Sequence, residues 1–176
     1  MNKLLIISDF DGTISQQDVN DYIFTNFGNE MSEEIEELYQ KGEIGLKEAL
    51  IRHYSHIKIN KRSFTKLIKE KIKLDPYFFD FYKEVRNSDI KFIIVSGGFI
   101  NYIKILFSQN KINFNNIYAN QLIFNDDKIK LNFFHDINEC KKEFNLCGNC
   151  KYKIIKNYKL KGYKIIYIGD GLTDRC

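Results

Sequence analysis

Carboxylates, hydroxyls and an amine occur in four short segments of this chain, and three of these segments directly follow an apolar run. The segments are Asp9-Phe10-Asp11-Gly12-Thr13, Ser96-Gly97-Gly98, Lys151 and Gly169-Asp170-Gly171-Leu172-Thr173-Asp174. Because the loops that follow parallel strands meet at one edge of an open α/β sheet, we expect these side chains to converge. Hard oxygen ligands together with an amine suit a magnesium-dependent transfer of a phosphoryl group.

Asp9 and Asp11 are two residues apart, so on an extended segment their carboxylates point the same way. Like charges this close raise the pKa of one carboxyl unless a cation joins them, and Mg²⁺ would be that cation. Gly12 and Thr13 allow the chain to turn so that backbone N–H groups face a phosphate. An ordinary Asp-Gly turn after a strand is the structural alternative.

The other three segments add phosphate and metal ligands. The Ser96 hydroxyl and the Gly97 amide would hydrogen-bond a phosphate oxygen, although Ser-Gly-Gly is also typical of a flexible turn. Lys151 follows the Cys-Gly-Asn-Cys loop and opens a predicted helix. A solvated lysine is the structural alternative, and Lys153 is the nearest competitor. Asp170 and Asp174 lie four residues apart around a tight glycine turn, which suits a metal ligand and a partner that orients the site.

Together, the four segments resemble the motifs of the haloacid dehalogenase (HAD) superfamily of aspartate-nucleophile phosphatases, over essentially the whole chain. The resemblance implies a Rossmann-like α/β core with a parallel sheet. It implies that Asp9 is the nucleophile that forms an aspartyl-phosphate, and that Asp11 protonates the leaving oxygen, activates water and binds the metal through its backbone carbonyl. The implied Mg²⁺ site comprises Asp9, Asp11, Asp170 and Asp174. The implied phosphate-binding residues are Thr13, Ser96, Gly97 and Lys151.

Several branches of the superfamily share these features. The first, second and fourth segments resemble the phosphoserine phosphatases. The loop at residues 147–151 (Cys-Gly-Asn-Cys-Lys) is similar to the methionine-salvage phosphatases that act on 2-hydroxy-3-keto-5-methylthiopentenyl-1-phosphate, as is the segment at residues 44–52. Phosphoethanolamine/phosphocholine phosphatases also place a cysteine before the lysine. The resemblance makes Asp18 and Arg52 substrate-binding candidates, with a helix N-cap and a surface cation as their respective alternatives, and it aligns His53 with the cap arginine of phosphoserine phosphatases.

Apolar spacing predicts helices over residues 19–27, 32–39, 46–54 and 63–72, before the boundary at Asp75-Pro76. We therefore predict a helical cap over residues 16–75 and a phosphatase core over residues 1–15 and 76–176. The resemblance implies a C1-type cap, which closes over the substrate. The core is expected to contain strands at 3–8, 90–95, 116–119 and 164–168, a hairpin at 122–124 and 129–131, and helices at 77–85, 100–107 and 151–158.

Composition narrows the partners. The net charge is +4 and the lysines are spread along the chain, so we expect no nucleic-acid partner. The resemblance implies that the substrate is a small phosphorylated metabolite. The apolar run at the start is too short for a signal peptide, and no segment approaches a membrane span, so we expect a cytoplasmic protein without a membrane partner. No feature of the sequence specifies an oligomeric state.

Two features stand apart from the motifs. Cys140, Cys147 and Cys150 lie within eleven residues and, with His135, offer ligands for structural zinc, whereas thiols that shape a loop are the alternative. The chain ends two residues after Asp174, where the resemblance implies further core elements. We therefore expect the C-terminal part of the core to be missing, and an inactive phosphate-binding protein is the non-enzymatic alternative.

Overall fold

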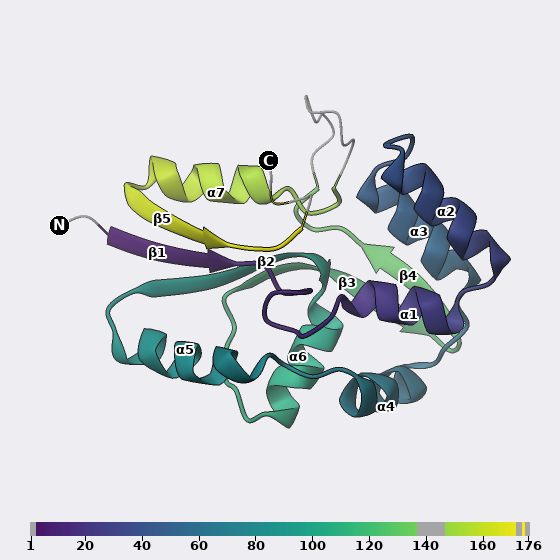
Figure 1. The fold of residues 1–176 in the computed structure, drawn as a ribbon, viewed down its shortest axis with the longest axis horizontal. Helices are drawn as coiled ribbons and strands as arrows, with labels where there is room; N and C mark the ends of the chain where they lie inside the picture. The colour runs from purple at the N-terminus through teal and green to yellow at the C-terminus, as the bar shows by residue number, and fades with distance from the viewer. Residues whose placement is uncertain (1–2, 137–146, 172–173, 175–176) are drawn as a thin grey trace.

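The computed structural model describes residues 3–136, 147–171 and 174, and it shows an α/β fold (Figure 1). One five-stranded sheet has the order β4-β3-β2-β1-β5, in which only the β3–β4 pair is antiparallel. The strands are β1 (Lys3–Ser8), β2 (Lys91–Phe99), β3 (Ile117–Asn125), β4 (Lys128–Asn132) and β5 (Tyr163–Ile168). The helices of the described residues are α1 (Val19–Phe27), α2 (Glu30–Gln40), α3 (Leu46–His56), α4 (Lys61–Lys71), α5 (Pro76–Asn87), α6 (Ile100–Gln109) and α7 (Lys151–Leu160). The predicted α/β fold with a mostly parallel sheet is confirmed.

Helices cover both faces of the sheet, and the side chains of β1 alternate between the two layers. Leu5 and Ile7 pack with Ile154 of α7 on one face. Ile6 belongs to the larger core on the opposite face, where α5 and α6 lie (Figure 1). A strand that is buried on both faces has a continuous apolar run, and such a run led to the prediction of a strand over residues 3–8.

Two strands differ from their predicted bounds. β2 does not end at Val95 but continues through the two glycines to Phe99, with a shift of register against β3 between these residues. The predicted short strands at 116–119 and 122–124 form the single strand β3. Asn120 interrupts the apolar pattern there, yet its side chain is buried because its amide donates to the Gly97 carbonyl, at 2.8 Å.

Asparagine and aspartate caps set the helix boundaries. The side chains of Asn29 and Asn60 accept backbone N–H groups at the starts of α2 and α4. Both helices therefore begin two residues earlier than the apolar spacing predicted. Asp75 caps α5, and Pro76 occupies its first turn, where a proline costs no hydrogen bond.

The insert between β1 and β2 that carries α1 to α4 corresponds to the predicted cap, and we call it the cap below. Two adjacent segments connect it to the core. Ser15 and Leu74 form an antiparallel bridge, and the Asp75 amide donates to the Ile14 carbonyl at 2.8 Å. Helices α1, α2 and α3 lie beyond the C-terminal ends of β1 and β5 (Figure 1). Helix α4 instead packs against the core helix α6. The insert thus overhangs the strand ends while one of its helices remains anchored to the core.

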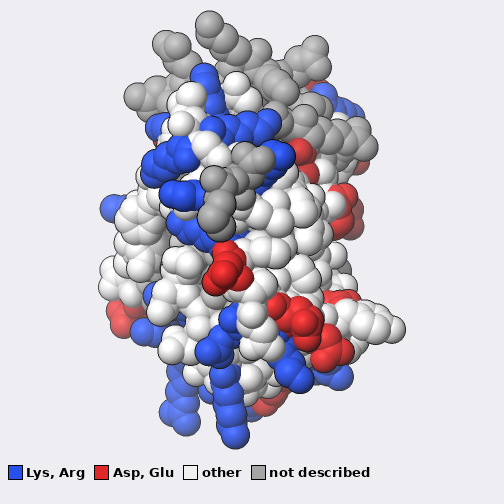
Figure 2. All heavy atoms as spheres, turned by 90° about the vertical axis from the view of Figure 1, so that its left-hand side faces the viewer, with Lys and Arg blue, Asp and Glu red and all other residues white. Residues whose placement is uncertain are grey.

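The surface carries charges of both signs. Figure 2 shows one face on which Lys and Arg side chains gather in the upper part, acidic side chains lie below them among uncharged ones, and further Lys and Arg side chains lie at the lower end. None of the described helices has both the length and the apolar character that crossing a bilayer requires.

Phe64 of α4 anchors the insert to the core, since its fully buried ring contacts Phe124 of β3 with ring centroids 5.2 Å apart. We expect Phe64→Ala to lower the free energy of unfolding by about 3–5 kcal/mol, measured by denaturant titration. Tyr77→Ala removes a ring that is 80% exposed and should cost less than about 1 kcal/mol. Equal losses in the two variants would contradict this anchoring role.

Candidate active site

The loops that follow β1 and β5 are joined directly. The Asp9 amide donates to the Ile168 carbonyl at 2.8 Å, and the Thr13 hydroxyl donates to Asp170 Oδ1 at 2.8 Å. Gly12 has a φ of +70°, and a Cβ there would lie 2.3 Å from Asp170 Oδ2. The tight turn therefore needs glycine both for its conformation and for the approach of the second loop.

Lys151, the first residue of α7, is buried between carboxylates from the two ends of the chain. Its ammonium lies 2.5 Å from Asp9 Oδ2 and 2.6 Å from Asp174 Oδ1. Asp174 also accepts hydrogen bonds from the Tyr167 hydroxyl and, at 3.0 Å, from the Gly171 amide. Lys151 is only 5% exposed, so these ion pairs form away from bulk water.

Burial and charge act in opposite directions on these groups. Burial raises the pKa of Asp9, and this outweighs the opposing effect of the Lys151 ammonium. Burial works to lower the pKa of Lys151, but Asp9 and Asp174 together raise it. Burial also works to raise the pKa of Asp174, yet Lys151 and the hydroxyl of Tyr167 bring it below its usual value. The proton therefore stays on the lysine.

A metal ion would find an all-oxygen donor set beside this lysine. Carboxylate oxygens of Asp9, Asp170 and Asp174 lie within 4.8 Å of one another, and they form the one such group in the part of the chain that the structure describes. Such donors fit Mg²⁺ better than softer metals. The carboxylate of Asp11 does not belong to this group, so a metal role for Asp11 is left to its backbone carbonyl.

The Asp11 side chain instead faces the junction between core and cap. Oδ2 accepts hydrogen bonds from the hydroxyls of Tyr102 (2.6 Å) and Ser96 (3.2 Å), and Oδ1 accepts one from the Val19 amide (3.1 Å). Burial raises the pKa of Asp11 well above its usual range, and the nearby carboxylate of Asp18 adds to this effect. Such a carboxyl holds a proton more readily than an exposed one, as an acid catalyst must.

The Ser96 hydroxyl contacts Asp11, and its contact with a phosphate oxygen stays a prediction. This fully buried hydroxyl donates to Asp11 and accepts from the Gly98 amide at 2.9 Å. Gly97 lines the cavity described next, and its carbonyl accepts a hydrogen bond from the Asn120 amide.

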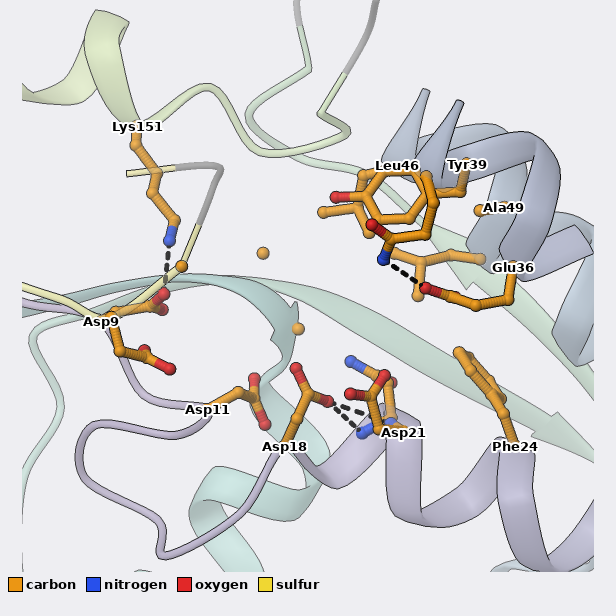
Figure 3. Close-up of a pocket in the computed structure, with 17 residues that line it drawn as sticks. Asp9, Asp11, Asp18, Asp21, Phe24, Glu36, Tyr39, Leu46, Ala49 and Lys151 are labelled. Carbon is orange, nitrogen blue, oxygen red and sulfur yellow. Dashed lines mark hydrogen bonds and ion pairs between the residues drawn. The ribbon is translucent and has the colours of Figure 1, made fainter. Parts of the chain in front are cut away.

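A cavity of about 310 Å³ opens between these groups and the cap (Figure 3). Lys151 and Asp9 lie at one end, and side chains of α1, α2 and α3 lie at the other. The cap side of the lining is acidic and aromatic: Asp18, Asp21, Phe24, Glu36 and Tyr39. Among the described residues that line the cavity, Lys151 is the only lysine or arginine.

The cap candidates separate into two groups. Asp18 lines the cavity and also caps α1, accepting the amides of Asn20 and Asp21. Burial, together with the charge of Asp21, raises the pKa of Asp18 to about 6. Arg52 is not brought to the cavity, because its guanidinium pairs with Glu48 one turn earlier on the exposed side of α3.

The side chain of Asn149 holds the loop before Lys151. The Asn149 amide nitrogen, fully buried, donates to the carbonyls of Ser96 (2.6 Å) and Tyr118 (2.9 Å). No disulfide joins Cys147 and Cys150, and neither belongs to a metal-binding group of described residues. Cys140 lies outside the described residues, so the zinc hypothesis remains a prediction.

Sequence reasoning missed four residues at this site: Tyr102, Asn149, Asp21 and Glu36. Asn149 sits inside a segment already singled out for its cysteines, so a polar residue directly before Cys150-Lys151 was an available signal. Asp21 and Glu36 lie on the predicted cap helices, but helical spacing alone could not show that their faces meet.

Comparisons with known proteins agree with this geometry. A family model described as Putative Phosphatase matches residues 4–176. The protein "2-hydroxy-3-keto-5-methylthiopentenyl-1-phosphate phosphatase" of Lysinibacillus sphaericus is 29% identical over 98% of this chain and 76% of its own length. "Pdp3-interacting factor 1" of Schizosaccharomyces pombe is 28% identical over 98% of this chain and 76% of its own length.

The same fold occurs in a solved "Phospho-Aspartyl Intermediate Analogue of Phosphoserine phosphatase". It superposes with a TM-score of 0.69 at 22% identity, covering 99% of this chain and 81% of the other. Fold and site therefore define a HAD-type phosphatase, which confirms the resemblance drawn from the four motifs. More particularly, the chain belongs to the Putative Phosphatase family.

Gly12 is required both by its left-handed backbone and by the close approach of Asp170, and a comparison with Gly42 separates the effects of the two. Gly42 has a φ of +73°, and a Cβ there would meet no described neighbour within 4 Å. We expect Gly12→Ala and Gly42→Ala each to lose roughly 1 kcal/mol of stability from the left-handed backbone. Only Gly12→Ala should also lose phosphatase activity, by about a hundredfold, because it displaces Asp170. Unchanged turnover of p-nitrophenyl phosphate in Gly12→Ala would contradict this interpretation.

Proposed function

We propose that this protein is a Mg²⁺-dependent phosphomonoester hydrolase that cleaves a small phosphorylated metabolite through an aspartyl-phosphate on Asp9. The observation that carries the proposal is the meeting of Asp9 with the buried Lys151 on one side and with Asp170 on the other. A cytoplasmic location, without a nucleic-acid or membrane partner, belongs to the same proposal.

In the first step, a carboxylate oxygen of Asp9 attacks phosphorus while the bond from phosphorus to the ester oxygen breaks. Asp11 gives its proton to the leaving oxygen. In the second step, Asp11 takes a proton from a water molecule that attacks the aspartyl-phosphate, and Asp9 and inorganic phosphate are released. Lys151 and Thr13 are proposed to hold the oxygens of the transferred group.

The metal would be held by Asp9 and Asp170, with the backbone carbonyl of Asp11, and Asp174 would orient Lys151 beside them. Bound there, Mg²⁺ supplies positive charge that offsets the negative oxygens of the phosphoryl group. Asp170 suits this role because it is exposed toward the cavity and its described partner is the Thr13 hydroxyl rather than a cation.

The substrate has three candidates. The names of the bacterial relatives support 2-hydroxy-3-keto-5-methylthiopentenyl-1-phosphate as the first compound to test. The acidic cap side of the cavity supports phosphoethanolamine or phosphocholine, whose leaving groups are cationic. Phosphoserine fits less well, because its carboxylate would approach Asp21 and Glu36 without a described cation at that end.

Replacing the nucleophile tests the reaction itself. We expect Asp9→Asn to lower the release of phosphate from p-nitrophenyl phosphate in Mg²⁺ by about a thousandfold or more, since an amide does not form the intermediate. Asp80→Asn, on the exposed side of α5, removes the same charge far from the site and should leave turnover unchanged. Equal turnover by Asp9→Asn and the wild type would rule out the nucleophile, whereas phosphate binding without turnover by the wild type would support the non-enzymatic alternative.

The charge of the cap side tests the cationic candidates. In the double variant Asp21→Asn/Glu36→Gln, kcat/KM for phosphoethanolamine should fall about tenfold relative to that for 2-hydroxyethyl phosphate, whose leaving group is uncharged, because two carboxylates near the ammonium are lost. Glu34→Gln changes an exposed carboxylate of the same helix α2 and serves as the control. A wild-type enzyme with no preference between the two substrates would argue against a cationic leaving group.

A further inference from the structure

Tyr102 makes the shortest described hydrogen bond to Asp11, although it belongs to none of the four motifs. Its hydroxyl donates to Asp11 Oδ2 at 2.6 Å, and the residue is fully buried on α6. Its ring lies against Phe10, the residue between the two motif aspartates, and against Phe99, with centroids 5.9 and 6.3 Å away. Packing therefore fixes the ring that carries this hydroxyl.

Gly98 leaves the space that this contact occupies. A Cβ at Gly98 would lie 1.5 Å from the Tyr102 hydroxyl and 2.5 Å from Asp11 Oδ2. Any side chain at this position would have to displace the hydroxyl, the carboxylate or both. The contact between Tyr102 and Asp11 thus explains the second glycine of Ser96-Gly97-Gly98.

The same hydroxyl is connected to the cap. The Asn20 amide nitrogen, on α1, approaches it at 3.4 Å, and Asn20 Oδ1 accepts a hydrogen bond from the Tyr54 hydroxyl of α3 at 2.9 Å. Asn20 and Tyr54 are both buried, so water does not readily replace these partners. The Val19 amide of α1 holds the other oxygen of Asp11.

We infer that Tyr102 is a positioning residue that aims the carboxyl of Asp11 at the leaving group, and that Asn20 and Tyr54 tie this orientation to the cap helices. The inference rests on the proposed function, in which Asp11 is the general acid. The cap then not only covers the substrate but also holds the acid in place, so that the leaving oxygen receives its proton only when α1 and α3 are seated on the core.

The experiment compares two substrates of nearly the same shape, phenyl phosphate and p-nitrophenyl phosphate. The nitrophenolate is a weak base and departs without a proton, whereas the more basic phenolate depends on the acid. Because kcat/KM covers the step in which the leaving group departs, we expect Tyr102→Phe to lower it by about tenfold or more for phenyl phosphate and by at most about twofold for p-nitrophenyl phosphate.

Two further variants complete the test. Tyr82→Phe is the control, because it removes a tyrosine hydroxyl that donates to the Asn113 carbonyl, at 3.0 Å. It should leave kcat/KM unchanged for both substrates. Tyr54→Phe removes the hydrogen bond to Asn20 at the cap end of this network. It should lower kcat/KM for phenyl phosphate selectively, by less than Tyr102→Phe does. A general packing defect would lower both substrates equally, so equal losses, or no loss, in Tyr102→Phe would overturn the inference. Failure of the proposed function has a different signature, because Asp9→Asn would then retain activity on both substrates.

Discussion

The buried ammonium of Lys151 is the interaction on which the rest of the site depends. A charge removed from water needs compensating carboxylates, and here they come from Asp9 after the first strand and from Asp174 after the last described one. The pairing of β1 with β5 brings the loops that carry these two carboxylates to one edge of the sheet, where α7 begins at Lys151. Removing either carboxylate would leave the ammonium with one of these two ion pairs, so the two loops that carry Asp9 and Asp174 are held together by electrostatics as well as by strand pairing.

The second feature that organises the site is the interface between the core and the cap. Asp11 accepts hydrogen bonds from the core through Tyr102 and Ser96, and from the cap through the Val19 amide. Asp18 begins α1 only a few residues further on, and its carboxylate joins the acidic side of the cavity. The segment that leaves β1 therefore carries the proposed nucleophile and acid and one side of the cavity within ten residues. Helix α4 contributes little to the cavity but fixes the insert to α6.

Much of this arrangement was predictable because it is local in sequence. Asp9, Asp11 and Thr13 were identified from one turn after an apolar strand, and Asp170 from another, and parallel strands had to bring these turns together. Tyr102 was not identifiable, because its hydroxyl reaches Asp11 only through packing around Gly98. Arg52 was predicted as a substrate-binding residue, but it lies away from the cavity. Its position on α3 did not show that its guanidinium would pair with Glu48 instead. The order of strands and turns predicts which loops meet at the edge of the sheet, whereas side-chain partners between distant elements depend on packing.

The central claim, that Asp9 and Asp170 share one divalent ion beside Lys151, has a direct test. Mn²⁺ takes the same hard oxygen ligands as Mg²⁺ and is identified in a crystal by its anomalous scattering. A crystal structure of this protein with Mn²⁺ should show an anomalous peak in contact with the carboxylates of both Asp9 and Asp170. A peak that contacts neither carboxylate, or no peak between them at saturating Mn²⁺, would contradict the account.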